Sequence, residues 1–280
     1  MLGAICGDIL GSVYEFEEIK YHNPGEISLC TEKGTFTDDT ILTLAVADWL
    51  LHDVEESRDD GVLKGALARQ FVKYAMYTFD RPAALFGFGV GFFRWLAKAD
   101  LIGDFSPYQS YGNGAGMRVS PVGWFFDTME ETLHFAKLTA DVTHDHPEGE
   151  RGAMCVAAAV FLARKGKSKE EIKAFLRREF GYALLDQSVA ELREACTWSA
   201  ACQDTVPMAM VAFLESHDYE SAIQNAICYG SDSDTIADMA GAVAEAFYGG
   251  VPRYIADACL AKLPPAQQEL VAEFYSRDAH

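Results

Sequence analysis

The amino-acid sequence predicts an all-α protein, a single compact orthogonal bundle of many helices that forms one domain over residues 1–280. Apolar residues recur three or four positions apart along much of the chain, which is the helical period. No Asn-Gly turn joins two β-rich runs. Alanine and glycine are abundant within helical segments such as "CVAAAVFLA" and "MAGAVAEAF", and small residues let helices approach closely. We see no Pro-, Ser- or charge-rich linker that would divide the chain.

The expected helices follow one another from the N-terminus. A glycine-punctuated first helix, "GAICGDILGS", leads to Glu15, and a strongly apolar helix follows Asp39. Periodicity predicts further helices over residues 61–79, 131–142, 151–166, 206–216 and 234–249. Only residues 26–36 alternate weakly in the manner of a strand. We therefore expect helices to supply the whole scaffold.

Start and stop signals agree with this assignment. Ser168 and Glu171 form a capping box for "SKEEIKAFLRREF", and Gly181 follows at the C-terminal end. Pro147 suits the first turn of another helix, and Gly166 can end it.

The charge balance disfavours partners that are polyanions. The formal net charge is -19, from 42 acidic and 23 basic residues, which opposes nonspecific attraction to nucleic acid or to an anionic membrane. The first residues lack a basic leading region, and no apolar run is long enough to span a bilayer. We expect a cytoplasmic protein that acts as a monomer without nucleic acid or membrane partners.

The cysteines support a reducing compartment. They are odd in number, scattered and without Cys-x-x-Cys spacing: Cys6, Cys30, Cys155, Cys196, Cys202, Cys228 and Cys259. We interpret them mostly as reduced core thiols rather than as disulfides or zinc ligands.

Two acidic corners carry the strongest chemical signal. "FTDDTILTLAVADWL" and "YGSDSDTIADMAGAVAEAF" each place two aspartates and a threonine directly before an apolar helix. In one interpretation, Thr37 or Ser231 caps the helix, and the aspartates in its first turn interact favourably with the helix dipole. In the other, the corners converge and the four carboxylates Asp38, Asp39, Asp232 and Asp234 bind hard cations. Ligation by oxygen alone suits Mg²⁺, Mn²⁺ or Ca²⁺, whereas Zn²⁺ prefers histidine or cysteine.

A glycine-rich loop adds a candidate ligand site. "YGNGAGMR" places three glycines between Gly112 and Gly116, which lets backbone N–H groups approach an anion closely. An ordinary flexible turn is the alternative. The segment "THDHPEGE" contains His144 and His146, and a polar interhelical loop is the expectation for His146.

Together these residues resemble the ADP-ribosylglycohydrolase family. The similar motifs run nearly from end to end: Gly7, Asp8 and Glu15; Phe36 to Thr40; "SYGNGAGMRVSPVG"; Thr143 and His144; and Asp232, Asp234 and Thr235. The resemblance implies an all-α fold with a binuclear magnesium centre, with Mn²⁺ as the alternative metal, in a cleft that takes the ADP-ribose moiety of modified proteins or of small conjugates.

The same resemblance implies roles for individual residues. The implied metal ligands are Thr37, Asp38, Asp39, Asp232, Asp234 and Thr235. The implied catalytic residues are Glu15, Asp38 and Asp39, and the implied substrate-binding residues are Ser110, Tyr111, Gly112, Asn113 and His144. The sequence departs from the family pattern at Ser231, where glycine is common, and a side chain there either narrows the metal cleft or supplies a helix cap. Ser233, where threonine is frequent, is a milder departure.

The expected reaction is hydrolysis of the bond at C1″ of the distal ribose, which releases ADP-ribose. Two alternatives stay open: a non-catalytic ADP-ribose-binding or structural member of the fold, and a metal-dependent phosphohydrolase, which also uses clustered aspartates. The loop "QSYGNG" slightly favours a serine-linked acceptor over an arginine-linked or O-acetyl one.

Overall fold

The computed structural model describes residues 1–15, 20, 23–29, 32–57, 59–79 and 87–277. These residues form an all-α fold, and no β-strand occurs among them apart from an isolated antiparallel bridge between Gly112 and Ala201. The α-helices are α1 (Leu2–Gly11), α2 (Asp38–His52), α3 (Asp60–Tyr77), α4 (Val90–Ile102), α5 (Gly114–Met117), α6 (Ser120–Phe125), α7 (Met129–Asp141), α8 (Pro147–Arg164), α9 (Lys169–Phe180), α10 (Val189–Ala195), α11 (Cys202–Glu215), α12 (Tyr219–Ile227), α13 (Ser233–Tyr248), α14 (Arg253–Leu260) and α15 (Pro265–Ser276). The described residues also form the 3₁₀ helices η1 (Pro24–Glu26), η2 (Val54–Glu56) and η4 (Ala183–Asp186).

All the helices predicted from periodicity are present, with ends shifted by a few residues. The predicted helix at 151–166 begins four residues earlier, with Pro147 in its first turn. The capping box of Ser168 and Glu171 opens α9, and Gly181 ends that helix in the left-handed conformation at φ 67°. The weak strand pattern at 26–36 forms no strand in the part that the structure describes, residues 26–29 and 32–36.

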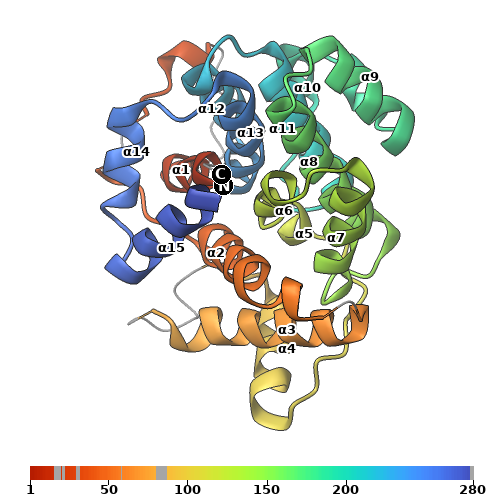
Figure 1. The fold of residues 1–280 in the computed structure, drawn as a ribbon. Coiled ribbons are helices and arrows are strands. Elements are labelled where there is room, and N and C mark those ends of the chain that lie inside the picture. The colour runs from red at the N-terminus through yellow and green to blue at the C-terminus, as the bar shows by residue number, and fades with distance from the viewer. Residues whose placement is uncertain (16–19, 21–22, 30–31, 58, 80–86, 278–280) are drawn as a thin grey trace.

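The two central helices, α1 and α13, pack against each other (Figure 1). They run antiparallel along a seam of small residues. A Cβ atom on Gly3 would lie 2.3 Å from the carbonyl oxygen of Gly241, and one on Gly7 would lie 2.2 Å from that of Ala237. At the end of the seam, a Cβ on Gly11 would lie 2.4 Å from the carbonyl oxygen of Ser233. Glycine is therefore required for this approach, which brings the C-terminal end of α1 against the N-terminal end of α13.

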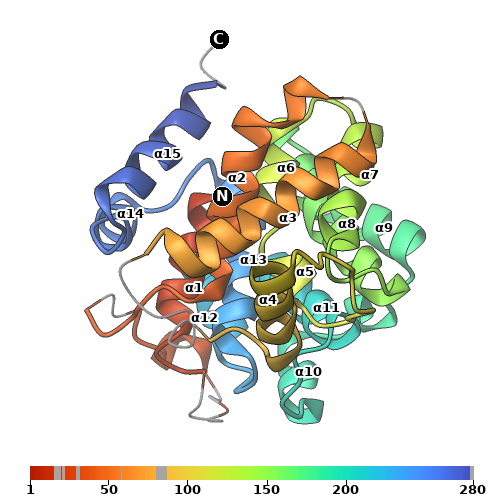
Figure 2. The ribbon, with the colours of Figure 1, turned by 90° about the horizontal axis from the view of Figure 1, so that it is seen from below.

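The other helices surround this pair. Figures 1 and 2 show α14 and α15 on one side of α1 and α13, and α7 to α11 on the other, with α3 beside α2 and α4 beside α3. Buried apolar side chains from α1 to α15 join in one hydrophobic core. None of the described helices combines the length and the apolarity needed to cross a bilayer. The cysteines of the described residues are unpaired, and all but Cys196 are buried, as expected; Cys30 lies outside the described residues.

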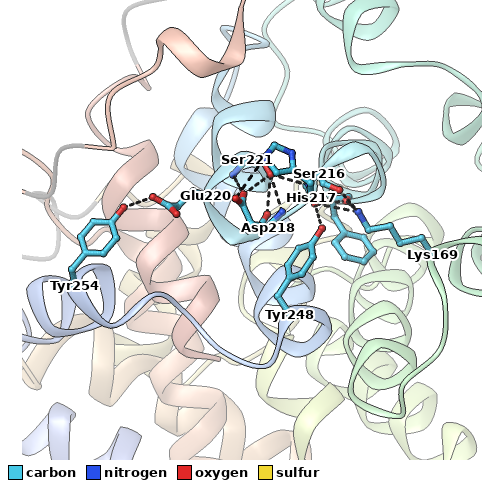
Figure 3. Close-up of polar contacts among 9 residues, drawn as sticks. Lys169, Ser216, His217, Asp218, Glu220, Ser221, Tyr248 and Tyr254 are labelled. Carbon is cyan, nitrogen blue, oxygen red and sulfur yellow. Dashed lines mark hydrogen bonds and ion pairs between the residues drawn. The ribbon is translucent and has the colours of Figure 1, made fainter.

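A lysine caps the end of one supporting helix. Lys169 Nζ donates to the carbonyl oxygens of Phe213 at 2.9 Å and Leu214 at 3.2 Å, and also to that of Ser216, at the C-terminal end of α11 (Figure 3). Cations at this end of a helix satisfy free carbonyl groups and interact favourably with the helix dipole. The contact fixes α9 against α11, whose N-terminal end lies near the candidate site.

Candidate functional site

The N-terminal ends of α2 and α13 meet beside the C-terminal end of α1. One carboxylate oxygen from each of Glu15, Asp232 and Asp234 lies within 4.8 Å of the others. A cavity of about 380 Å³ opens at this point, and Asp38, Asp39 and Thr235 also line it. The predicted convergence of the two acidic corners is therefore observed.

Asp8 organises the start of α2. Its carboxylate accepts hydrogen bonds from the backbone N–H of Thr37 at 3.0 Å and of Thr40 at 3.1 Å. The hydroxyl of Thr37 donates to Asp8 Oδ1 at 2.8 Å, and the hydroxyl of Thr40 donates to Oδ2. Burial raises the pKa of Asp8 to about 6, against these donors, which lower it. Asp8 was not among the predicted site residues, because its partners follow it by 29 and 32 positions.

Thr37 caps α2, as one interpretation of the sequence expected. Its Oγ1 accepts from the backbone N–H of Asp39 at 3.3 Å and lies 3.3 Å from Asp39 Oδ2. Thr37 itself is not among the residues that line the cavity. Asp39 Oδ1 is buried and has no hydrogen-bond partner among the described residues. Burial of a carboxylate oxygen without a hydrogen-bond partner lowers the stability of a folded protein, and a bound cation would offset this loss.

The prediction that Ser231 caps α13 is wrong, and the Ser231 side chain does not line the cavity. Asp232 occupies the N-cap position of α13 without a side-chain cap bond. Ser231 is buried outside the cavity lining, and its Oγ accepts from the backbone N–H of Ser199 at 3.2 Å. Its side chain therefore holds the segment next to Trp198 and Ala200, which do line the cavity. Because the donor, Ser199, lies 32 positions away in the chain, local sequence patterns could not predict this hydrogen bond.

Crowding of the carboxyls shifts their titration in the metal-free protein. Burial, followed by repulsion from Asp232, raises the pKa of Glu15 to about 7. Burial and neighbouring carboxylates also hold the pKa of Asp38, Asp39 and Asp234 well above the usual range. Simultaneous ionisation of these four carboxyl groups at neutral pH is therefore unfavourable without a bound cation.

The glycine-rich loop forms another wall of the cavity. Ser110, Gly112, Asn113 and His144 line it, whereas Tyr111 does not and is 52% exposed. Asn113 Nδ2 donates to Asp232 Oδ2 at 2.7 Å, so the loop contacts the acidic cluster directly. None of the loop glycines has a positive φ. They are needed for close packing instead, because a Cβ on Gly114 would lie 3.0 Å from His144 Nε2.

Neighbouring segments hold this loop in place. The backbone N–H of Asn113 donates to the carbonyl oxygen of Ala200 at 2.8 Å. The backbone N–H of Cys202 donates to the carbonyl oxygen of Tyr111 at 2.9 Å. Gln109 has a φ of 54°, and its backbone N–H donates to Asp145 Oδ1 at 2.7 Å. No local sequence pattern predicted the left-handed conformation of Gln109.

The "THDHPEGE" segment separates its two histidines. His144 is 4% exposed and lines the cavity. His146 is the N-cap residue before α8, and its Nδ1 accepts from the backbone N–H of Glu148 at 3.1 Å, consistent with the expected interhelical loop.

Comparison with known proteins identifies relatives along most of the chain. The family model described as ADP-ribosylglycohydrolase matches residues 1–279. The chain is 29% identical over 316 residues to the ADP-ribosylhydrolase ARH3 of Homo sapiens, covering 89% of this chain and 84% of that protein. It is 27% identical to the ADP-ribosylarginine hydrolase Tri1 of Pseudomonas putida, covering 90% of this chain and 71% of that protein. A solved ADP-ribosylglycohydrolase-related protein complex shares the fold, with a TM-score of 0.72, 24% identity, and coverage of 98% of this chain and 96% of that one.

Proposed function

The chain belongs to the ADP-ribosylglycohydrolase family, and from this premise we propose that it is a magnesium-dependent hydrolase of ADP-ribosylated acceptors. It cleaves the glycosidic bond at C1″ of the distal ribose and releases ADP-ribose. The observation that carries the proposal is the meeting of Glu15, Asp232 and Asp234 in a cavity that Asn113 and His144 also line. A cavity of about 380 Å³ falls within the size range of small-ligand sites.

The residues present fit a pair of divalent cations. Glu15, Asp38, Asp39, Asp232 and Asp234 supply a formal charge of -5, which two Mg²⁺ ions nearly balance. The donors are all oxygen atoms, which suits Mg²⁺ or Mn²⁺, and Asp39 Oδ1 is buried without a partner among the described residues. The proposed ligands are Thr37, Asp38, Asp39, Asp232, Asp234 and Thr235. When bound, the ions would polarise a water molecule and the ribose hydroxyls as Lewis acids.

Glu15 is the proposed proton carrier. Glycosidic cleavage requires a proton for the leaving group and a base for the attacking water, and its transition state resembles an oxocarbenium ion. A carboxyl group can donate a proton and, once ionised, accept one, and Glu15 lines the cavity beside Asp232 and Asp234. Asp38 and Asp39, which line the same cavity, would help to hold the cations that polarise the water molecule.

The loop and His144 are the proposed binding groups for the rest of the ligand. Ser110, Gly112, Asn113 and His144 line the cavity and offer hydroxyl, backbone and ring donors to ribose or diphosphate oxygens. Tyr111 is proposed to contact the ligand at the exposed rim of the same loop.

Release of free ADP-ribose tests this function. Purified protein and Mg²⁺ are incubated with serine- and arginine-ADP-ribosylated peptides, because the loop favours the first linkage while Tri1 is named for the second. We expect Mg²⁺-dependent release of intact ADP-ribose from one of them. AMP or phosphate as the product would instead identify a phosphohydrolase. Binding of ADP-ribose without release from any peptide would identify a non-catalytic binder.

A further inference from the structure

The guanidinium of Arg118 is fully buried, lines the cavity and has no part in the mechanism above. It lies over the Phe71 ring, with Cζ 4.5 Å from the ring centroid. Its Nη2 donates to the carbonyl oxygen of Thr139 and to Thr143 Oγ1, both at 2.9 Å. Nε and Nη1 have no hydrogen-bond partner among the described residues. Burial of such a charge is costly, so its placement calls for a reason beyond packing.

The hydroxyl of Thr143 connects Arg118 to His144. Thr143 Oγ1 is 2.7 Å from His144 Nδ1, and in the described part of the chain its hydrogen-bonding neighbours are this nitrogen and Arg118 Nη2. An arginine can only donate, so Thr143 Oγ1 accepts from Nη2, and Nδ1 is the acceptor that the described residues offer to the hydroxyl proton of Thr143. In a neutral imidazole, an accepting Nδ1 leaves the proton on Nε2.

The Nε2 atom faces the glycine-rich loop. A Cβ on Gly114 would lie 3.0 Å from Nε2, and one on Gly112 would lie 3.6 Å from it. No described residue forms a hydrogen bond with Nε2, although His144 lines the cavity. We propose that Arg118 and Thr143 are positioning residues that fix His144 in the Nε2–H tautomer, so that this N–H donates to an oxygen atom of the bound ligand.

The surroundings of the ring keep it neutral. Burial, followed by the nearby positive charge of Arg118, holds the pKa of His144 well below its usual value. The Tyr108 ring packs beside the imidazole, with centroids 5.9 Å apart. The hydrogen-bond donor is therefore available without protonation of the ring. The identity of the ligand as ADP-ribose rests on the proposed function, whereas the tautomer does not.

Nuclear magnetic resonance of isotope-labelled histidine tests the assignment directly. A two-bond nitrogen–proton correlation spectrum separates the two tautomers, and the signals of His144 are those lost in His144→Gln. We expect an unprotonated Nδ1 and a protonated Nε2 at neutral pH. Thr143→Val keeps the side-chain shape but removes the hydroxyl, so we expect both tautomers to appear and ADP-ribose to bind about tenfold more weakly.

Thr143→Ser is the matched control, because it retains the hydroxyl. Thr143→Ser should keep the Nε2–H signals and most of the affinity for ADP-ribose that Thr143→Val loses. A purely structural role of Thr143 would not require this difference between the two variants. A wild-type ring protonated on Nδ1, or on both nitrogens, would overturn the proposal even if Thr143→Val failed to fold. Unchanged His144 signals in a folded Thr143→Val variant would also overturn it. Nε2–H signals without ADP-ribose binding would overturn the proposed function and leave the tautomer standing.

Discussion

Asn113 Nδ2 donates to Asp232 Oδ2 at 2.7 Å, and this hydrogen bond joins the glycine-rich loop to the acidic corner of α13 across 119 positions of the chain. Both residues are buried. A neutral amide donor satisfies one carboxylate oxygen without occupying the cavity, and it ties the proposed ligand-binding wall to the proposed metal-binding wall.

Asn113→Ala should therefore weaken both folding and ligand binding. Removing the donor leaves a buried carboxylate oxygen unpaired, which costs about 1–3 kcal/mol in the free energy of unfolding. We expect urea unfolding to show this loss and calorimetry to show weaker ADP-ribose binding. Asn225→Ala is the matched control, because Asn225 Nδ2 donates to the carbonyl oxygen of Ala212 at 3.0 Å outside the cavity lining. ADP-ribose binding that fell equally in both variants would contradict a specific role for Asn113.

Glu15→Gln should separate catalysis from metal binding. The amide keeps an oxygen atom near Asp232 and Asp234 but cannot exchange a proton, so turnover should fall at least about 100-fold while the response to Mg²⁺ is largely kept. Release of ADP-ribose and the Mg²⁺-dependent rise in Tm are measured on the same sample. Glu26→Gln, at an exposed residue of η1, is the control. Near-normal turnover in Glu15→Gln would remove Glu15 from the mechanism.

The double variant Asp38→Asn with Asp234→Asn should lose the response to magnesium. A ligand that binds only the folded protein raises the free energy of unfolding, by about 2.7 kcal/mol at a concentration one hundred times its Kd. The wild-type Tm should rise with Mg²⁺, and the Tm of the double variant should stay constant. An identical magnesium titration in the two proteins would rule out these aspartates as ligands.

The metal-free protein should lose stability as pH rises. The pKa of Glu15 is raised from 4.5 to about 7 and that of Asp8 from 3.8 to about 6, so between these limits the folded state holds protons that the unfolded state has released. The free energy of unfolding then decreases with rising pH. The lowered pKa of His144 has the opposite effect on stability. Below its ordinary value of 6.5, the unfolded state binds a proton that the folded state does not, so the free energy of unfolding rises with pH there. The contribution of Glu15 is therefore measured with a variant that retains His144.

Glu15→Gln provides that comparison. In EDTA, a change from about pH 5.5 to about pH 7.5 should lower the Tm of the wild type more than that of Glu15→Gln, because the variant lacks one of the titrating carboxyls. Saturating Mg²⁺ should reduce the difference between the two proteins, since bound cations favour the ionised form. Parallel pH profiles in EDTA would show that Glu15 does not titrate in this window.

Gly114→Ala should displace His144. The added Cβ would lie 3.0 Å from Nε2 and 3.2 Å from Cε1, so the ring must shift. We expect a loss of about tenfold or more in ADP-ribose affinity, comparable to the loss of a well-placed hydrogen bond. Gly89→Ala is the control, because a Cβ at Gly89, which also lines the cavity, meets nothing within 4 Å among the described residues. Equal affinities in the two variants would contradict the tight fit of His144 against the loop.

Local sequence patterns predicted much of the scaffold and both acidic corners. The apolar period gave α3, α7, α8, α11 and α13, and the Thr37 cap follows from residues adjacent in the chain. Helix α4 was not predicted, although "VGFFRWLAKADLI" is apolar; it leaves Leu101 and Ile102 exposed at 79% and 74%.

What the sequence did not predict depends on partners distant in the chain. Asp8 was part of a motif, but its function as an acceptor for the start of α2 requires α1 and α2 to meet. Ser231 has the residue type and position of a helix cap, yet its hydroxyl oxygen accepts a hydrogen bond from the backbone N–H of Ser199. The partners of Arg118 lie 21 and 25 positions further on, in α7 and the turn after it. Local propensity contains no information about such contacts.

Calorimetric titration of Mg²⁺ into the metal-free protein shows whether the two acidic corners together bind a pair of cations. If the corners around Asp38 and Asp234 bind the cations jointly, the wild type should bind two Mg²⁺ per chain, and Asp38→Asn with Asp234→Asn should bind none in the same range. Absence of Mg²⁺ binding by the folded wild type, or an unchanged stoichiometry in the double variant, would contradict the account.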